Sequence, residues 1–206
     1  MQNKGNRIGI LGGTFNPIHN GHLKLAEAAR KAEQLDKILI MPSGHSYLKS
    51  HMQVLDGQKR YEMVKLAVSD IPYLSASDME IMRAGNTYTY ETLALLKKQY
   101  PDDIFYFIMG ADNLFSIENW VKPEEIFANC IILVAVRNHM DDDCLKAKAE
   151  ELKASFGTKI QLLPMEEFNI SSNRIRSFCK ENNVAAVKNQ IPIAVYEYIV
   201  EHGLYQ

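Results

Sequence analysis

The chain has 206 residues, of which 47% are hydrophobic and 23% are charged, and this composition predicts a globular protein with a buried core. Its formal net charge of -2 argues against a broad basic surface, so polymeric nucleic acid is not an expected partner. Three dispersed cysteines without a CxxC pair indicate reduced thiols, and no apolar run is long enough to span a membrane. We therefore expect one cytoplasmic domain over residues 1–206, with a helical segment over 169–206 packed on it and no membrane partner.

Short apolar runs alternate with segments of helical periodicity, an order typical of an α/β fold with a doubly wound parallel sheet. The runs are solidly apolar, as expected of strands that are buried on both faces. They predict strands at residues 7–11, 37–41, 104–109, 131–136 and 160–163. Helices are predicted at residues 22–33, 57–69, 90–100, 146–156, 173–181 and 192–202. Residues 43–53 are predicted to form a polar loop. Residues 73–93 show partial alternation, followed by a turn around Gly85 and Asn86 and then a helix start.

A glycine pair, Gly12 and Gly13, directly follows the first predicted strand. Ligands of open parallel sheets bind at the carboxyl ends of strands, and glycines there let the backbone approach a ligand closely. The helix that begins near Gly21 directs unpaired N–H groups and a positive dipole end to the same place. The pattern therefore predicts an anion site, and we expect the anion to be a phosphate.

His19 and His22 are three residues apart across this helix start, so both rings can project toward that site. An imidazole can donate a hydrogen bond to a phosphate oxygen. Two other interpretations stay open: zinc ligation, which lacks a recognisable third ligand, and an ordinary pair of loop and cap histidines. From the residue counts, H-x-G-H is expected by chance only about 0.01 times in this chain, which favours a function.

The stretch "GGTFNPIHNGH", residues 12–22, resembles the G-x-F-D-P-x-H-x-G-H signature of the nucleotidyltransferase superfamily. A second stretch, "NISSNRIRS" at residues 169–177, is similar to that superfamily's I-S-S-T-x-I-R pattern. Alone, this second stretch also fits a capped surface helix, because Ser171 and Ser172 are strong helix-capping residues. Together the motifs imply a Rossmann-like nucleotidyltransferase fold with a helical C-terminal segment.

The middle of the chain resembles the bacterial nicotinate-nucleotide adenylyltransferases, and the resemblance extends over essentially the whole sequence. It rests on four stretches: "GNTYTYETL" (85–93), "FIMGADNLFSIENW" (107–120), "IILVAVR" (131–137) and "EHGLY" (201–205). Pantetheine-phosphate adenylyltransferases are typically shorter and lack the Y-T and G-A-D…W elements. Cytidylyltransferases usually carry R-T-E-G-I-S-T-T in place of "NISSNRIRS".

The resemblance implies attack by the 5′-phosphate of nicotinate mononucleotide on the α-phosphorus of ATP, with release of pyrophosphate. The protein then needs no nucleophile, because it aligns two polyanions and stabilises the charge that develops. The implied catalytic residues are His19, His22, Lys49 and Arg176. Mg²⁺ is implied as a cofactor, bound mainly through the ATP phosphates rather than by a protein metal site.

The resemblance also assigns residues to the two nucleotides. Besides His19, His22 and Arg176, ATP contacts are implied for Gly12, Gly13, Thr14, Phe15, Gly110, Asp112, Ile170, Ser171 and Ser172. Contacts with the acceptor nucleotide are implied for Asn16, Lys49, Tyr88, Thr89, Trp120 and Arg137. Without the resemblance, Trp120 and Tyr88 could equally be packing residues and Lys49 a solvated surface lysine.

Three departures from the family pattern stand out: Asn16 replaces the usual Asp, Asn173 replaces a common Thr, and "GHSYLKSH" (44–51) lacks the prolines often found before the loop lysine. We expect them to tune affinity, with Asn16 as the position that bears on metal handling. Nicotinamide mononucleotide and phosphopantetheine remain alternative acceptors, and a catalytically silent nucleotide sensor remains an alternative function. The sequence leaves the oligomeric state open, including a homo-oligomer.

Overall fold

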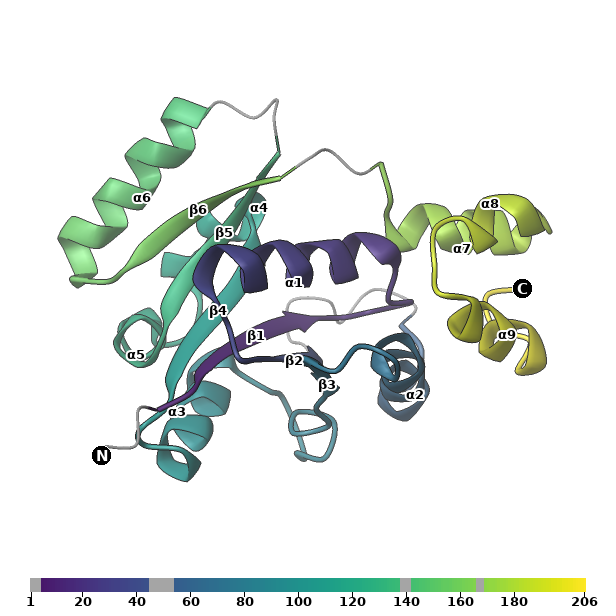
Figure 1. Cartoon of the computed structure of the whole chain (residues 1–206), viewed down its shortest axis with the longest axis horizontal. Coiled ribbons are helices and arrows are strands. Elements are labelled where there is room, and N and C mark those ends of the chain that lie inside the picture. The colour runs from purple at the N-terminus through teal and green to yellow at the C-terminus, as the bar shows by residue number, and fades with distance from the viewer. Residues whose placement is uncertain (1–4, 45–53, 138–141, 166–168) are drawn as a thin grey trace.

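The computed structural model describes residues 5–44, 54–137, 142–165 and 169–206, excluding the side chains of residues 137 and 142 (Figure 1). In these residues, six parallel strands form one sheet in the order β3-β2-β1-β4-β5-β6. The strands are β1 (Arg7–Gly13), β2 (Lys37–Pro42), β3 (Leu74–Ala76), β4 (Ile104–Gly110), β5 (Ile131–Arg137) and β6 (Ile160–Met165). The predicted α/β parallel sheet is therefore confirmed.

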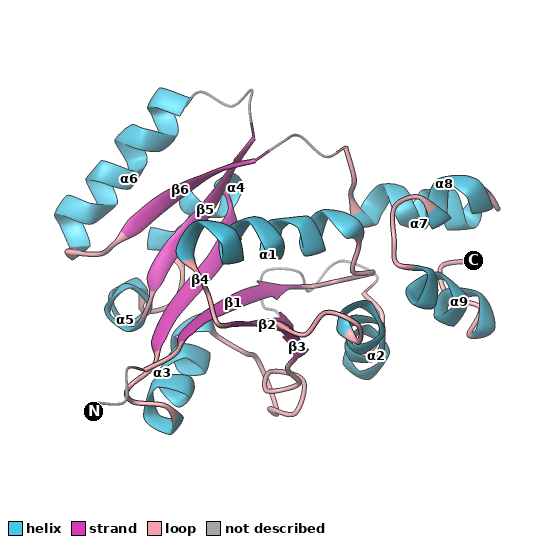
Figure 2. Cartoon of the chain, in the orientation of Figure 1, coloured by secondary structure: helices cyan, strands magenta, loops and turns pink. Residues whose placement is uncertain are grey.

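Helices cover both faces of the sheet, as the solidly apolar strands predict (Figure 2). The longer helices are α1 (Asn20–Glu33), α2 (Gly57–Val68), α3 (Thr89–Gln99), α6 (Asp142–Phe156), α7 (Ser172–Lys180) and α9 (Ile193–Glu201). Shorter ones are α4 (Ala111–Leu114), the 3₁₀ turn η2 (Ile117–Asn119), α5 (Pro123–Asn129) and α8 (Val184–Lys188). Within the described residues, no helix is both long and apolar enough to cross a membrane.

The hydrophobic core has two halves, one on each face of the sheet. Alternate residues of β1 separate them: Leu11 belongs to the half with α1, α2 and α7–α9, and Ile10 to the half with α3–α6. This alternation follows from the two-residue period of side chains along a strand. In the first half, Ile175 of α7 and Ile199 of α9 join a cluster that also contains Met63 of α2.

Five short elements are absent from the set predicted from the sequence. One is β3, an edge strand of three residues that pairs with β2 and lies in the partly alternating stretch 73–93. The others are the helices α4, α5 and α8, of four, seven and five residues, and the three-residue turn η2. Elements this short carry too few residues for a periodicity to emerge, so tertiary pairing and packing decide them. Of the predicted loop at residues 43–53, the structure describes Ser43 and Gly44, and residues 45–53 lie outside the described residues.

Candidate active site

The site forms at the carboxyl edge of the sheet, where β1 lies between β2 and β4. Gly12 of β1 is level with Met41 of β2, and Leu11 is level with Ile108 of β4. The strand order turns back between β1 and β4, and in doubly wound sheets such a switch point opens a crevice for ligands. The loops after β1, β2 and β4 therefore all begin around one crevice.

The glycine pair after β1 makes room for an aromatic ring. Phe15 is buried and has a positive φ of 46°, so its ring folds back onto Gly13. A Cβ atom added to Gly13 would lie 2.9 Å from that ring, closer than real contacts allow. Gly12 instead lines the crevice, where a Cβ atom would meet the Phe107 ring at 3.6 Å, an ordinary contact. Packing of the Phe15 ring thus requires glycine at position 13, whereas Gly12, which has no side chain, leaves space in the crevice for a ligand.

The two histidines lie at the start of α1, as their spacing predicts. His19 is the N-cap residue and His22 occupies the third helical position. Their rings stack with centroids 3.6 Å apart and an interplanar angle of 21°. The backbone N–H of His19 donates to Nδ1 of His22 at 3.2 Å, so the neutral His22 ring carries its proton on Nε2. This tautomer is the one that can donate from the far side of the ring to a phosphate oxygen.

The second motif packs directly against the loop that contains the first. Ser172 Oγ donates to the carbonyl oxygen of Pro17 at 2.8 Å, and Arg176 Nη1 donates to the carbonyl oxygen of Asn16 at 2.8 Å. Ser171 caps α7 by accepting from the N–H of Arg174 at 3.3 Å. Ile170 lies beside the start of α1, because a Cβ on Gly21 would be 3.8 Å from its Cβ. The structure therefore brings the two predicted motifs together.

Asn16 is buried inside this loop, and its side-chain oxygen contacts the protein. Oδ1 accepts from the hydroxyl of Tyr205 at 2.8 Å and from the N–H of Leu55 at 3.4 Å. Burial raises the pKa of Tyr205 above its ordinary value of 10, although the charges of Arg176 and Arg60 oppose this shift. Tyr205 therefore stays protonated and remains the donor. The sequence interpretation did not assign a role to Tyr205.

Arg60 of α2 is a second residue that the sequence interpretation missed. Its side chain is buried and donates to three backbone carbonyl oxygens: Leu55 at 2.9 Å, Thr14 at 2.8 Å and Ser43 at 2.7 Å. Burial lowers its pKa, with the charge of Asp56 acting in the opposite direction. The sequence signal was present, because Arg60 shares the helix face of Met63, Val64 and Ala67, where a charge needs a buried partner. Arg60 joins the loop after β1 to the end of β2.

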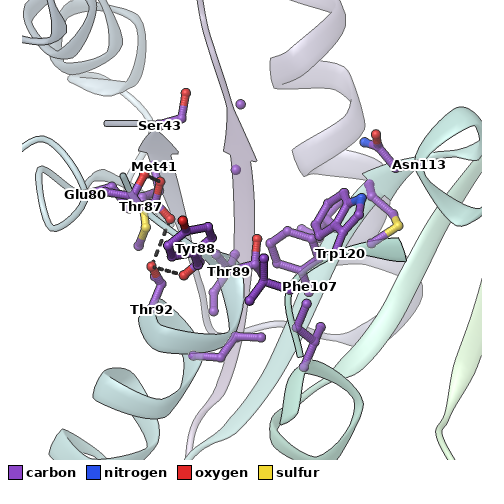
Figure 3. Close-up of a pocket in the computed structure, with 18 of the residues that line it drawn as sticks. Met41, Ser43, Glu80, Thr87, Tyr88, Thr89, Thr92, Phe107, Asn113 and Trp120 are labelled. Atoms are coloured by element: carbon purple, nitrogen blue, oxygen red, sulfur yellow. Dashed lines mark hydrogen bonds between the residues drawn. The ribbon is translucent and has the colours of Figure 1, made fainter. Parts of the chain in front are cut away.

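A cavity of about 170 Å³ opens beside the glycine pair (Figure 3). Trp120 and Phe107 form one wall, their rings edge to face at 6.2 Å. Opposite lie Tyr88 and Thr89, the N-cap and first residue of α3, so the positive end of that helix faces the cavity. The cavity suits a flat aromatic ring that carries an anionic group. Further lining residues are Thr14, Met41, Ser43, Glu80, Thr87, Thr92 and Asn113.

The remaining predicted site residues lie at other places. Gly110 is the N-cap residue of α4, and Asp112 is an exposed residue in the first turn of that helix. Lys49 lies outside the described residues, as does the side chain of Arg137 at the end of β5. The described residues contain no group of three or more His, Cys, Asp or Glu side chains that could hold a metal ion.

The fold and the motifs at its carboxyl edge define a nucleotidyltransferase, and residues 10–178 match the family model described as cytidylyltransferase-like. A probable nicotinate-nucleotide adenylyltransferase from Lachnoclostridium phytofermentans is 42% identical over 199 residues, covering 97% of this chain and 98% of the relative. One from Dehalococcoides mccartyi strain CBDB1 is 40% identical over 203 residues, covering 97% of each. The chain belongs to the nicotinate-nucleotide adenylyltransferase family.

A solved structure of Plasmodium falciparum nicotinic acid mononucleotide adenylyltransferase complexed with NaAD has a similar fold. Its TM-score is 0.79, its sequence identity 24%, and the match covers 97% of each chain. A structure of the same enzyme complexed with APC gives a TM-score of 0.76 at 23% identity, again over 97% of each chain. These likenesses confirm the Rossmann-like architecture.

Proposed function

We propose that this chain transfers the adenylyl group of ATP to nicotinate mononucleotide, forming nicotinate adenine dinucleotide and pyrophosphate in NAD biosynthesis. One observation carries the proposal: the cavity between Trp120 and the start of α3 opens beside Gly12 and Gly13. These glycines lead into residues 14–19, the loop between β1 and α1 that we call the histidine loop. A pyridine nucleotide in this cavity would have its phosphate next to the residues suited to ATP. The family relationship over almost the whole chain supports the same reaction.

In this reaction a 5′-phosphate oxygen of the acceptor attacks the α-phosphorus of ATP, and the bond to pyrophosphate breaks on the opposite side. We assign His19 and His22 to the transferred phosphoryl group, where a ring N–H stabilises the charge that develops. Arg176 and Lys49 would neutralise the leaving pyrophosphate. ATP would be held by the loop Gly12–Phe15, the α7 start at Ile170–Ser172, and the β4 end at Gly110 and Asp112.

We propose that the acceptor nucleotide binds with its pyridine ring in the cavity between Trp120 and the start of α3. Trp120 would stack on the pyridine ring, and the N–H groups at Tyr88 and Thr89 would bind its carboxylate at the positive end of α3. Asn16 and Arg137 complete the proposed acceptor contacts. An acid is favoured over an amide here because a helix N-terminus attracts a negative charge.

Mg²⁺ fits this site as a companion of ATP. The side chains that donate hydrogen bonds to the histidine loop include the guanidiniums of Arg60 and Arg176 and the hydroxyl of Ser172, groups that suit phosphate oxygens rather than a metal ion. Mg²⁺ prefers oxygen ligands and keeps several waters, so we propose that it binds mainly through the ATP phosphates and neutralises their charge. We also propose a cytoplasmic location, because the reaction consumes ATP.

We further propose that residues 1–206 work as one nucleotidyltransferase domain. Two contacts support this: the hydrogen bonds from Ser172 and Arg176 to the loop after β1, and the core cluster that Ile175 shares with α2. The segment 169–206 would then be part of the active site rather than a separate module.

The test is pyrophosphate release from ATP and Mg²⁺ with three acceptors: nicotinate mononucleotide, nicotinamide mononucleotide and phosphopantetheine. We expect the highest kcat/KM with nicotinate mononucleotide. A preference for either other acceptor would overturn the acceptor assignment, and release with none would indicate a nucleotide sensor. Omission of Mg²⁺ should abolish pyrophosphate release from ATP with the preferred acceptor.

A further inference from the structure

Glu80 lies in the wall of the acceptor cavity, on the same side as Tyr88 and Thr89 (Figure 3). Both of its carboxylate oxygens accept hydrogen bonds from threonine hydroxyls. Oε2 accepts from Thr87 Oγ1 at 3.1 Å, and Oε1 accepts from Thr92 Oγ1 at 2.9 Å. Glu80 therefore bridges two residues on either side of the Tyr88–Thr89 pair.

This bridge restrains the start of α3. Thr87 precedes the N-cap residue, and Thr92 lies in the first turn, where its Oγ1 is also 3.3 Å from the carbonyl oxygen of Tyr88. Both threonines are buried, with 7% and 3% of their surface exposed. Hydrogen bonds to a carboxylate are stronger than neutral ones, and here the two donor residues are buried while Glu80 is partly exposed. Glu80 thus fixes the backbone that presents N–H groups to the cavity.

The network continues outward through Arg83, which donates from Nη1 to Thr92 Oγ1 at 3.0 Å and pairs with the Glu91 carboxylate. The Arg83 and Glu91 side chains are 22% and 35% exposed, so water partly screens this ion pair. A hydroxyl has one proton, and Thr92 gives its proton to Glu80 while accepting from Arg83. The inner and outer halves of the network can therefore be tested separately.

The end of β2 packs against the same wall. A Cβ atom added to Gly44 would lie 2.3 Å from the carbonyl oxygen of Glu80 and 2.8 Å from Cγ2 of Thr87. The glycine allows the chain after β2 to touch the Glu80 backbone directly. The cavity wall that contains Glu80 is thus held in place by α3 on one side and by the chain after β2 on the other.

We propose that Glu80 is a positioning residue that determines acceptor affinity and selectivity. It acts through Thr87 and Thr92, which set the direction of the N–H groups at the start of α3 toward the pyridine carboxylate. This inference rests on the proposed function, because it assumes that the cavity holds the pyridine ring. The loss of Glu80 should weaken binding of the acceptor while ATP binding is retained, because ATP is assigned to the other side of the site.

The experiment compares KM for each substrate in the full-length protein. Glu80→Ala should raise KM for nicotinate mononucleotide about tenfold, the loss expected for a charged hydrogen-bond network, and leave KM for ATP within about twofold. Glu80→Gln should give an intermediate increase, because an amide can replace only one acceptor oxygen. The kcat/KM ratio of nicotinate to nicotinamide mononucleotide should fall in both variants.

Glu91→Gln is the matched control, since it breaks the outer ion pair and leaves both threonine hydroxyls on Glu80. Glu80→Ala and Thr87→Val should be less than additive when combined, because each removes the hydrogen bond between Thr87 and Glu80. If Glu80 variants do not fold, Thr87→Val and Thr92→Val carry the same test singly. Equal rises in both KM values, or no rise in the acceptor KM, would overturn the inference. A wild-type protein that is inactive with every acceptor would instead overturn the proposed function.

Discussion

The hydroxyl of Tyr205 donates a hydrogen bond of 2.8 Å to Oδ1 of Asn16, across 189 residues of sequence. Asn16 also accepts a hydrogen bond from Arg176 on its backbone oxygen and one from the N–H of Leu55 on its side-chain oxygen. The C-terminal helices, the segment before α2 and the loop after β1 therefore meet at one residue. The stability of the histidine loop should therefore depend on the C-terminal segment.

We expect Tyr205→Phe to lower the free energy of unfolding by about 1–2 kcal/mol, because it leaves a buried amide oxygen with one donor fewer. Urea denaturation with a constant m-value measures this change. Tyr196→Phe is the control, since it removes a hydroxyl from α9 without touching Asn16. Equal stability of the wild type and Tyr205→Phe would show that the hydrogen bond contributes nothing to the fold.

The contribution of Tyr205 should also depend on pH. Burial raises its pKa in the folded state above the unfolded value of about 10, so the folded state binds its proton more tightly. The stabilisation is then complete below about pH 10 and declines as the pH rises toward the folded pKa. The difference in unfolding free energy between wild type and Tyr205→Phe should shrink above about pH 10. A difference that grows in this range contradicts the assigned donor.

The sequence was sufficient for the features that local pattern controls. The apolar runs located five strands of the sheet, and the glycine pair with the two histidines located the loop after β1. The contacts of Tyr205 with Asn16 and of Arg60 with Thr14 and Ser43 were not found because these partners lie far apart along the chain. Glu80 was not found because no helix or strand periodicity connects it to Thr87 and Thr92. The side-chain oxygen of Asn16 accepts hydrogen bonds from Tyr205 and Leu55. An aspartate oxygen could accept the same two bonds, so the exchange of aspartate for asparagine keeps these contacts.

Each histidine should be needed for turnover and not for folding. We expect His19→Asn and His22→Ala to reduce kcat for pyrophosphate release by about 10²–10³-fold, the cost of losing one preorganised donor. Asparagine at position 19 keeps a good N-cap residue for α1, so the helix start is preserved. Circular dichroism checks the fold. His202→Ala, an exposed histidine after α9, should retain wild-type kcat, and near-normal turnover in either site variant would contradict the assignment.

Arg60 should matter for stability more than any other charge on α2. Arg60→Met leaves three carbonyl oxygens without their donor, so we expect a loss of about 3 kcal/mol or more of unfolding free energy. Arg60→Lys should recover part of this loss, because a lysine keeps the charge but lacks the planar fork. The melting temperatures of these variants are compared with that of Lys59→Met, which changes an exposed residue next to Arg60. A melting temperature for Arg60→Met equal to that of Lys59→Met is the outcome that excludes this role.

Trp120 is the only tryptophan in the sequence, so its fluorescence reports directly on the acceptor cavity. Stacking of a pyridine ring on the indole should quench the emission saturably as nicotinate mononucleotide is added, with little change from ATP alone. Trp120→Phe retains an aromatic face and should raise the acceptor KM only a few-fold, whereas Trp120→Ala should raise it about tenfold or more, since it removes the whole ring. Quenching by ATP but not by the acceptor would move the pyridine ring out of this cavity. Because emission is measured without turnover, the titration tests the binding site even in the His22→Ala variant.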